Sequence, residues 1–89
     1  MKIIRFTALW CADCIVMRPR WEAVFDRRKD IVIDDYDFDD HEVEAKNYNV
    51  TKVPQLIFVN DKSIEIERLV GMQDQERLEQ IIEKYFKEE

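Results

Sequence analysis

The two cysteines of the chain, Cys11 and Cys14, stand three residues apart, directly after a short apolar and strand-like run. On a helix, residues i and i+3 lie on one face, so the two sulfur atoms can close a small disulfide ring. If Cys11 begins the helix, unpaired backbone N–H groups and the helix dipole stabilise its thiolate, which is the reactive form of cysteine. The spacing therefore predicts a strand that leads into a helix carrying a dithiol–disulfide pair.

Length and composition indicate a single folded domain, residues 1–89, with room for one core. The formal net charge of −6 argues against broad nucleic-acid binding, which depends on Lys and Arg neutralising phosphates. No apolar run approaches the roughly 18 residues of a membrane-spanning helix, and the apolar start before Arg5 is too short for a signal peptide. We therefore expect a cytoplasmic protein without a membrane partner, in which a cysteine pair is more often catalytic or metal-binding than structural.

Hydrophobic periodicity predicts four strands and three helices. In order they are a strand at 2–7, a helix from Cys11, a strand at 31–33, a helix at 41–47, strands at 55–59 and 63–70, and a helix that begins at Gln73 or Asp74. Helical crossovers make the first two strands parallel, and the turn at 60–62 makes the last two an antiparallel hairpin. The predicted fold class is α/β, in the order β-α-β-α-β-β-α, with a mixed four-stranded sheet flanked by three helices.

Three local features refine this outline. Pro19 lies inside the first helical pattern and should kink that helix about one turn past Cys14. The uninterrupted β-branched run at 31–33 is typical of a strand buried on both faces. Asp39 or Asp40 can cap the second helix, and Asp39 with Glu42 resembles a capping box.

Local motifs accompany this element order. They are the Trp10-Cys11-Ala12-Asp13-Cys14 segment, Pro19 five residues after Cys14, the Tyr48-Asn49-Val50-Thr51-Lys52-Val53-Pro54 segment, and Val70-Gly71-Met72. In this order and spacing they resemble the thioredoxin family, with its Trp-Cys-Gly-Pro-Cys active site, its helix-kinking proline, the segment that ends in its cis-proline, and its glycine loop. The resemblance runs from about Ile3 to the C-terminus and lacks the family's extra N-terminal strand and helix. It implies a minimal thioredoxin-like fold.

The resemblance implies a thiol–disulfide oxidoreductase that reduces protein disulfides. Cys11 would be the nucleophile and Cys14 the resolving thiol, which are the catalytic pair of the family. No dissociable cofactor is implied, because the redox-active disulfide Cys11–Cys14 carries the electrons. The implied partners are protein disulfide substrates and a thioredoxin-reductase-like electron donor, and we expect a monomer.

The same resemblance implies a substrate-binding surface. Val53 and Pro54 would present their backbone to an extended substrate segment, beside Trp10 and the Gly71 loop. We expect Trp10 to be exposed enough to touch substrate. The resemblance also implies a cis peptide bond between Val53 and Pro54, since X–Pro bonds are otherwise cis in only about 5–6% of cases.

Asp13 departs from the family pattern, because it replaces a neutral proline between the two sulfurs. A carboxylate close to Cys11 disfavours a second negative charge, so it should raise the thiol pKa and favour a more reducing protein. In the other interpretation, Asp13 simply occupies the first helical turn, where the dipole favours acidic residues. The two interpretations are compatible.

Arg5 and Asp35 form a second departure. Thioredoxins bury an aspartate where this chain has Arg5, six residues before Cys11, and they carry a lysine where this chain has Asp35. We predict a charge-swapped Arg5–Asp35 pair beneath the motif, near Cys14, because an unpaired charge at that depth is costly. Asp35 would then accept the proton of Cys14, directly or through one water. The alternative is that both side chains are merely solvated.

Two other functions remain open from the sequence. A glutaredoxin-like, glutathione-dependent reductase fits the minimal architecture, although Trp10 is thioredoxin-like and Gly71 is the only glycine. A non-catalytic thioredoxin-fold binding module would keep the fold while its cysteines serve a metal or stay idle. No metal site is predicted. The cysteines and His41 leave zinc one ligand short, and the calcium-loop spacing of Asp35, Asp37 and Asp39 lacks the required glycine and glutamate.

Overall fold

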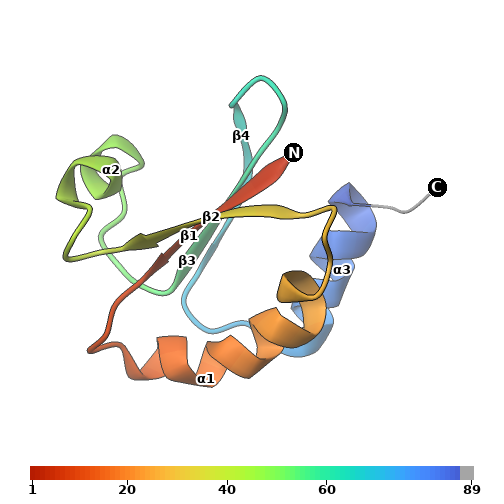
Figure 1. Cartoon of the computed structure of the whole chain (residues 1–89), viewed down its shortest axis with the longest axis horizontal. Helices are drawn as coiled ribbons and strands as arrows, with labels where there is room; N and C mark the ends of the chain where they lie inside the picture. The colour runs from red at the N-terminus through yellow and green to blue at the C-terminus, as the bar shows by residue number, and fades with distance from the viewer. Residues whose placement is uncertain (87–89) are drawn as a thin grey trace.

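The computed structural model describes residues 1–86 and has the predicted order of strands and helices (Figure 1). The elements are β1 (Lys2–Thr7), α1 (Ala12–Trp21), a π-helical turn η1 (Glu22–Asp26), β2 (Val32–Asp37), α2 (Glu42–Asn47), β3 (Gln55–Val59), β4 (Glu65–Val70) and α3 (Gln75–Tyr85). The last helix begins after Asp74, whose side chain accepts the N–H of Arg77 at 2.8 Å, so the predicted start at Asp74 is confirmed as an N-cap.

The four strands form one mixed sheet in the order β2-β1-β3-β4. β1 runs parallel to β2 and antiparallel to β3, and β3 pairs with β4 as an antiparallel hairpin. α1, η1 and α3 cover one face of the sheet, while α2 lies on the other face (Figure 1). The predicted α/β class and mixed four-stranded sheet are confirmed.

The two faces of the sheet follow from the period-2 alternation of β1. Ile3 faces α1 and α3 and belongs to the larger core cluster, which includes both cysteines. Ile4 and Phe6 face the other way and pack with Ala45 of α2 in a smaller cluster. Both faces are therefore apolar, although the helices that cover them differ greatly in length.

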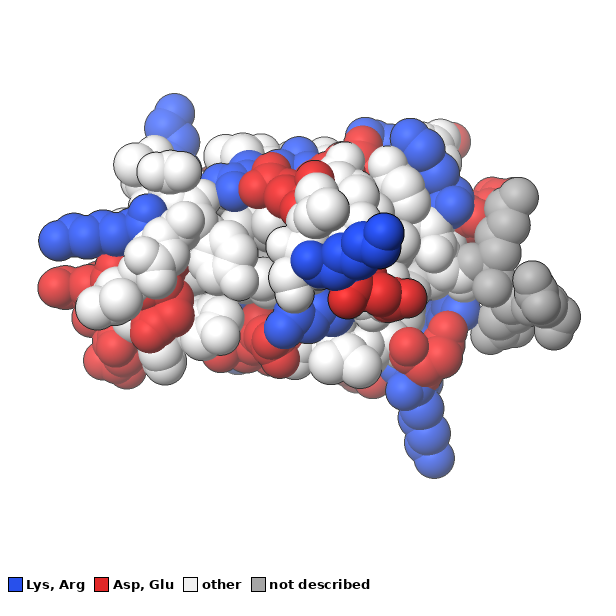
Figure 2. Space-filling model, turned by 90° about the horizontal axis from the view of Figure 1, so that it is seen from above, with Lys and Arg blue, Asp and Glu red and all other residues white. Residues whose placement is uncertain are grey.

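Long charged side chains help the short α2 to cover its face. The Lys2 ammonium donates to Asp34 at 2.9 Å, and this hydrogen bond, followed by the charge of Asp34, raises the pKa of Lys2. Arg68 donates to the Tyr48 carbonyl at 2.7 Å and to the Gln55 side-chain oxygen at 2.8 Å. Seen from above, positive and negative side chains alternate over the middle of this face (Figure 2). Their aliphatic stems can shield the apolar sheet from water.

The prediction that the strand at 31–33 is buried on both faces is wrong. In the described part of the chain, β2 has one neighbouring strand, β1, and therefore lies at an edge of the sheet. Val32 is 55% exposed because α2 lies at the opposite end of β2 and leaves this end uncovered (Figure 1). The pattern predicted a strand here correctly, but the burial of a strand depends on its place in the sheet.

The predicted cap of the second helix is also wrong. His41 occupies the N-cap position of α2 without a side-chain cap bond. Asp39 and Asp40 lie just before it, where the Asp37 carboxylate accepts both of their N–H groups, at 2.9 and 3.2 Å. Asp39 and Asp40 therefore belong to a local hydrogen-bonded turn that precedes α2, and neither of them caps the helix.

Candidate active site

Cys11 and Cys14 form a disulfide at the start of α1. Cys11 is the N-cap residue, with an extended backbone, and its sulfur accepts the backbone N–H of Cys14 at 3.1 Å. An N–H group directed at the sulfur, together with the helix dipole, stabilises negative charge on Cys11 when the disulfide is opened. The predicted place of the pair at a helix start is therefore confirmed.

The turn between β1 and α1 and the buried face of α1 fix this disulfide. The Cys11 N–H donates to the Ala8 carbonyl at 3.2 Å, which closes the turn. Farther along α1, the buried Met17 accepts the backbone N–H of Gln73 on its sulfur at 3.3 Å. The start of α1 is thus held from the strand side and from the loop that precedes α3.

Trp10 stands beside the disulfide with 64% of its surface exposed, as predicted. Its indole N–H donates to the Asp39 carboxylate at 2.8 Å, and its ring meets Phe38 edge-on, with centroids 6.5 Å apart. The indole is therefore accessible and also fixed in orientation. The sequence did not reveal Asp39 as its partner, because the contact spans 29 residues and depends on the turn after β2.

The Pro54 and Gly71 loops lie against each other. The Val53–Pro54 peptide bond is cis, and the Pro54 carbonyl accepts the N–H of Gly71 at 2.8 Å. Gly71 has a φ of +82°, a conformation that L side chains rarely adopt, although a Cβ there would meet open space. Val53 packs against the core cluster that contains both cysteines. The structure thus connects these predicted substrate-binding residues to the neighbourhood of the disulfide.

Arg5 and Asp35 form the predicted ion pair. They are direct register partners on β1 and β2, and Arg5 donates to both carboxylate oxygens, from Nε at 2.5 Å and from Nη2 at 3.0 Å. Asp26 accepts from Nη1 at 3.0 Å, and the guanidinium carbon lies 4.9 Å from the centre of the Trp21 ring. We call Arg5, Asp26, Asp35 and Trp21 the Arg5 cluster. Sequence patterns did not reveal Asp26, which the π-helical turn after α1 brings over β1.

Arg5 is 11% exposed, whereas Asp35 is 57% exposed. Burial lowers the pKa of Arg5, but the hydrogen bonds and charges of Asp35 and Asp26 outweigh burial and raise it above its ordinary value. Arg5 is therefore a permanent cation inside the cluster, and the alternative of a merely solvated Arg5 is wrong. Trp21 and Cys14 both lie on the buried face of α1, so this face of the helix connects the Arg5 cluster to the disulfide.

The Arg5 cluster opens into a cleft of about 360 Å³ between α1 and the β2 edge. The cleft is lined by Arg5, Thr7, Arg18, Trp21, Asp26, Asp35, Tyr36 and Asp37. Neither cysteine lines it, so a proton that moves between Cys14 and Asp35 has to cross the packing beneath α1. The half-exposed Asp35 carboxylate gives water a route to the ion pair from this side.

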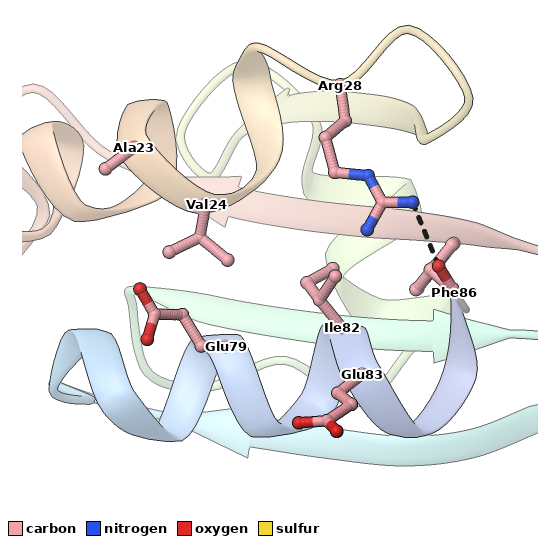
Figure 3. A pocket seen from close by; sticks show the side chains of 7 residues that line it. All are labelled: Ala23, Val24, Arg28, Glu79, Ile82, Glu83 and Phe86. Atoms are coloured by element: carbon pink, nitrogen blue, oxygen red, sulfur yellow. Dashed lines mark hydrogen bonds between the residues drawn. The ribbon is translucent and has the colours of Figure 1, made fainter. Parts of the chain in front are cut away.

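A larger cavity, of about 550 Å³, lies between η1 and α3 and is not part of the disulfide site (Figure 3). Val24, Ile82 and Phe86 line it, and Arg28 donates to the Phe86 carbonyl at 2.9 Å. Neither cysteine is among its lining residues. This larger cavity is therefore separate from the disulfide and its chemistry.

Residues 1–86 offer little for other kinds of site. Within them, no group of three or more His, Cys, Asp or Glu side chains is arranged to hold a metal ion. No helix in this part of the chain is long and apolar enough to cross a membrane. His41 lies edge-on to Tyr36, with ring centroids 5.0 Å apart.

Comparisons with known proteins agree with this geometry. The thioredoxin family model matches residues 1–84. The thioredoxin of Chlamydia caviae is 31% identical over 85 residues, which span 96% of this chain and 82% of that protein. The mitochondrial thioredoxin of Bos taurus is 30% identical over 83 residues, but the match spans only 49% of its length.

Solved structures give the same result for the fold. The structure of a mutant thioredoxin from Halobacterium salinarum superimposes with a TM-score of 0.84 at 30% identity, covering 97% of this chain and 74% of that one. Nothing in these matches favours the glutaredoxin-like alternative.

Proposed function

The chain belongs to the thioredoxin family and is a thiol–disulfide oxidoreductase, and we propose that it acts mainly as a reductant of disulfides in other proteins. The observation that carries this proposal is the Cys11–Cys14 disulfide at the start of α1, beside the exposed Trp10. Asp13 supports the reducing direction, because an exposed carboxylate between the two sulfurs disfavours the thiolate of the dithiol form. The two cysteines carry the electrons without a dissociable cofactor.

The proposed reaction proceeds in two thiol–disulfide exchanges. The Cys11 thiolate attacks one sulfur of the partner disulfide, forms a mixed disulfide and releases the other partner sulfur as a thiolate. The Cys14 thiolate then attacks the Cys11 sulfur, which restores the Cys11–Cys14 disulfide and releases the second partner thiolate. The partner gains two electrons, the Cys11–Cys14 pair loses two, and the released thiolates take up protons from solvent.

We propose Asp35 as the proton acceptor of Cys14 and Arg5 as the residue that positions it. Because neither cysteine lines the cleft that holds Asp35, the proton would reach the carboxylate through water rather than by direct contact. The exposure of Asp35 and the adjoining cleft leave room for that water.

We further propose that Val53, Pro54, Trp10 and the Gly71 loop bind the substrate segment. A thioredoxin-reductase-like donor would return the two electrons to the disulfide. We also infer that the protein acts in the cytoplasm, because the proposed reductant needs a compartment in which thiols are kept reduced, and we propose that it acts as a monomer. The net charge of −6 supports protein rather than nucleic-acid substrates.

Reduction of insulin by a dithiol reductant, with and without the protein, tests the proposal. We expect the wild-type chain to accelerate the reaction and Cys11→Ser to remove the acceleration, a loss of at least about 10³-fold, because serine is a poor nucleophile at neutral pH. Cys14→Ser should retain attack on the disulfide and accumulate mixed disulfides that mass spectrometry detects. Acceleration that persists unchanged in both variants would contradict the proposal.

A further inference from the structure

Apolar side chains stand exposed on both sides of the disulfide. Leu9, in the turn before α1, is 90% exposed, and Trp10 follows it. Ile15, directly after Cys14, is 64% exposed, and the neighbouring Val16 is also exposed. We call Leu9, Trp10, Ile15 and Val16 the apolar flank. Exposed apolar side chains that gather at one place on a small protein indicate an interaction site.

The residues of the apolar flank adjoin the two cysteines in the chain, and their backbone is held in place. Leu9 and Trp10 belong to the turn that the Cys11 N–H closes on the Ala8 carbonyl, and Ile15 donates its N–H to the Cys11 carbonyl at 3.4 Å. The bond from Trp10 to Asp39 fixes the indole. A partner whose disulfide reaches Cys11 therefore meets a fixed backbone and a fixed indole, which lowers the entropy lost on association.

The charges beside the flank define the chemistry of the partner. The Asp39 carboxylate lies 2.8 Å from the Trp10 indole nitrogen, Asp40 follows it, and Asp13 stands exposed between the cysteines. On the proline side, the exposed Lys52 precedes Val53. Three carboxylates against the Lys52 ammonium and the Arg18 guanidinium, which is exposed on α1, still leave the surroundings of the flank negative, so they attract basic segments and repel acidic ones.

We propose that Leu9 and Ile15 determine substrate specificity, and that the preferred substrates are protein segments whose disulfide is flanked by an apolar side chain and by Lys or Arg. This inference rests on the proposed reduction of protein disulfides. The apolar side chain of the substrate packs on the flank, and its cation faces Asp13 and Asp39. Both contacts form when the mixed disulfide forms, so they favour the first exchange step.

Four disulfide peptides test this specificity. They differ only next to the reactive cysteine, where one position is Leu or Ser and another is Lys or Glu. The second-order rate constant of each with the reduced full-length protein can be followed by tryptophan fluorescence. We expect the Leu/Lys peptide to react fastest and the Ser/Glu peptide slowest. Raising the salt concentration should narrow the Lys-over-Glu preference and leave the Leu-over-Ser preference, because salt screens exposed charges.

Matched variants locate the contacts. Leu9→Ser and Ile15→Ser should each lower the Leu-over-Ser preference, by about fivefold, since each exchange removes one apolar contact surface. Asp13→Asn should lower the Lys-over-Glu preference by about twofold. Ile64→Ser serves as the control, because Ile64 is equally apolar and 56% exposed but lies in the β3–β4 turn, at the end of the sheet where β1 begins.

The outcomes separate this inference from the proposed function. Equal reduction of all four peptides by the wild-type protein, or a Leu preference unchanged in both flank variants, would overturn the inference while leaving protein disulfide reduction intact. A wild-type protein that reduces neither the peptides nor insulin would instead overturn the proposed function. A Leu preference lost equally in Ile64→Ser would also contradict the assignment to the flank.

Discussion

The disulfide and the Arg5 cluster both lie on the face of the sheet that α1 and α3 cover, but they are assembled in different ways. The disulfide and its exposed tryptophan come from five consecutive residues, 10–14, and the helix start places the two sulfurs, although Trp10 also takes its orientation from Asp39. The Arg5 cluster takes side chains from β1, α1, η1 and β2 and exists only when all four have docked. A site whose chemistry is local thus stands beside a site whose electrostatics depend on the whole fold.

This difference predicts where a substitution acts. A change in the disulfide should affect catalysis and leave the reduced fold nearly unchanged. A change in the Arg5 cluster should affect the free energy of unfolding first, and catalysis only through the position of Asp35. Substitutions at charged residues inside and outside the cluster test this distinction.

Arg5→Met should have the largest effect on stability. It removes the cation that two carboxylates share, and we expect the free energy of unfolding of the reduced protein to fall by about 2 kcal/mol. The value lies below that of a fully buried pair because Asp35 is more than half exposed and can be hydrated. Urea unfolding followed by tryptophan fluorescence measures the change.

Lys2→Met is the matched control for Arg5→Met. Lys2 is on the same strand and also pairs with one carboxylate, Asp34, but both partners are more than a third exposed. We expect the free energy of unfolding to stay close to that of the wild type, as for other exposed ion pairs. An equal fall in the free energy of unfolding in the two variants would contradict the view that the Arg5 cluster stabilises the tertiary structure more than an exposed ion pair does.

Asp35→Asn should separate the two exchange steps. If Asp35 accepts the proton of Cys14 through water, the resolution of the mixed disulfide should slow by about tenfold, while the attack by Cys11 keeps its rate. Rapid acid quenching and mass spectrometry of the mixed disulfide measure both steps.

Asp26→Asn distinguishes proton transfer from support of Arg5. Asp26 also holds the guanidinium, but in the structure it bonds a different nitrogen, Nη1. We expect its loss to leave the resolution step within about twofold of wild type and to lower stability slightly. Equal slowing in Asp26→Asn and Asp35→Asn would mean that both act through the position of Arg5.

The two modes of assembly also explain which features the sequence could predict. The disulfide, its helix start and the exposed Trp10 depend on neighbours in the chain, so spacing and capping rules predict them. The Arg5–Asp35 pair was predictable from the family resemblance because both residues occupy known strand positions. Asp26 was not, since its reach to Arg5 depends on a π-helical turn that no local pattern signals.

Tertiary contacts also account for the two predictions of local structure that were wrong. The run at 31–33 carries the propensity of a buried strand, but its exposure depends on the lack of a second neighbouring strand in the described sheet. Aspartate is a common helix cap, but the Asp37 carboxylate accepts the N–H groups of Asp39 and Asp40. The Asp39 carboxylate itself accepts the indole N–H of Trp10. The first case was decided by the place of the strand in the sheet, and the second by a local turn together with the long-range contact to Trp10.

Asp30 forms a local ion pair, with a residue only two positions away, and its loss should show the smallest effect. Arg28 donates to both Asp30 oxygens, at 3.1 and 2.6 Å, with the same two-bond geometry as Arg5 with Asp35. The hydrogen bond from Arg28 holds the pKa of Asp30 below its ordinary value of 3.8. A carboxyl whose pKa is lower in the folded state stabilises the fold above its unfolded pKa and loses that contribution as the pH falls through its folded pKa.

Urea unfolding of Asp30→Asn across a pH series measures this contribution. At pH 7 the variant should be slightly less stable than wild type, because the Asp30 carboxylate is then fully ionised in both states. The difference should shrink as the pH falls below about 4 and vanish once the pH lies below the folded pKa, since the carboxyl is then protonated in both states. A difference that stays constant over this range would show that the Arg28–Asp30 pair acts through packing, and that its two-bond geometry contributes no electrostatic stabilisation.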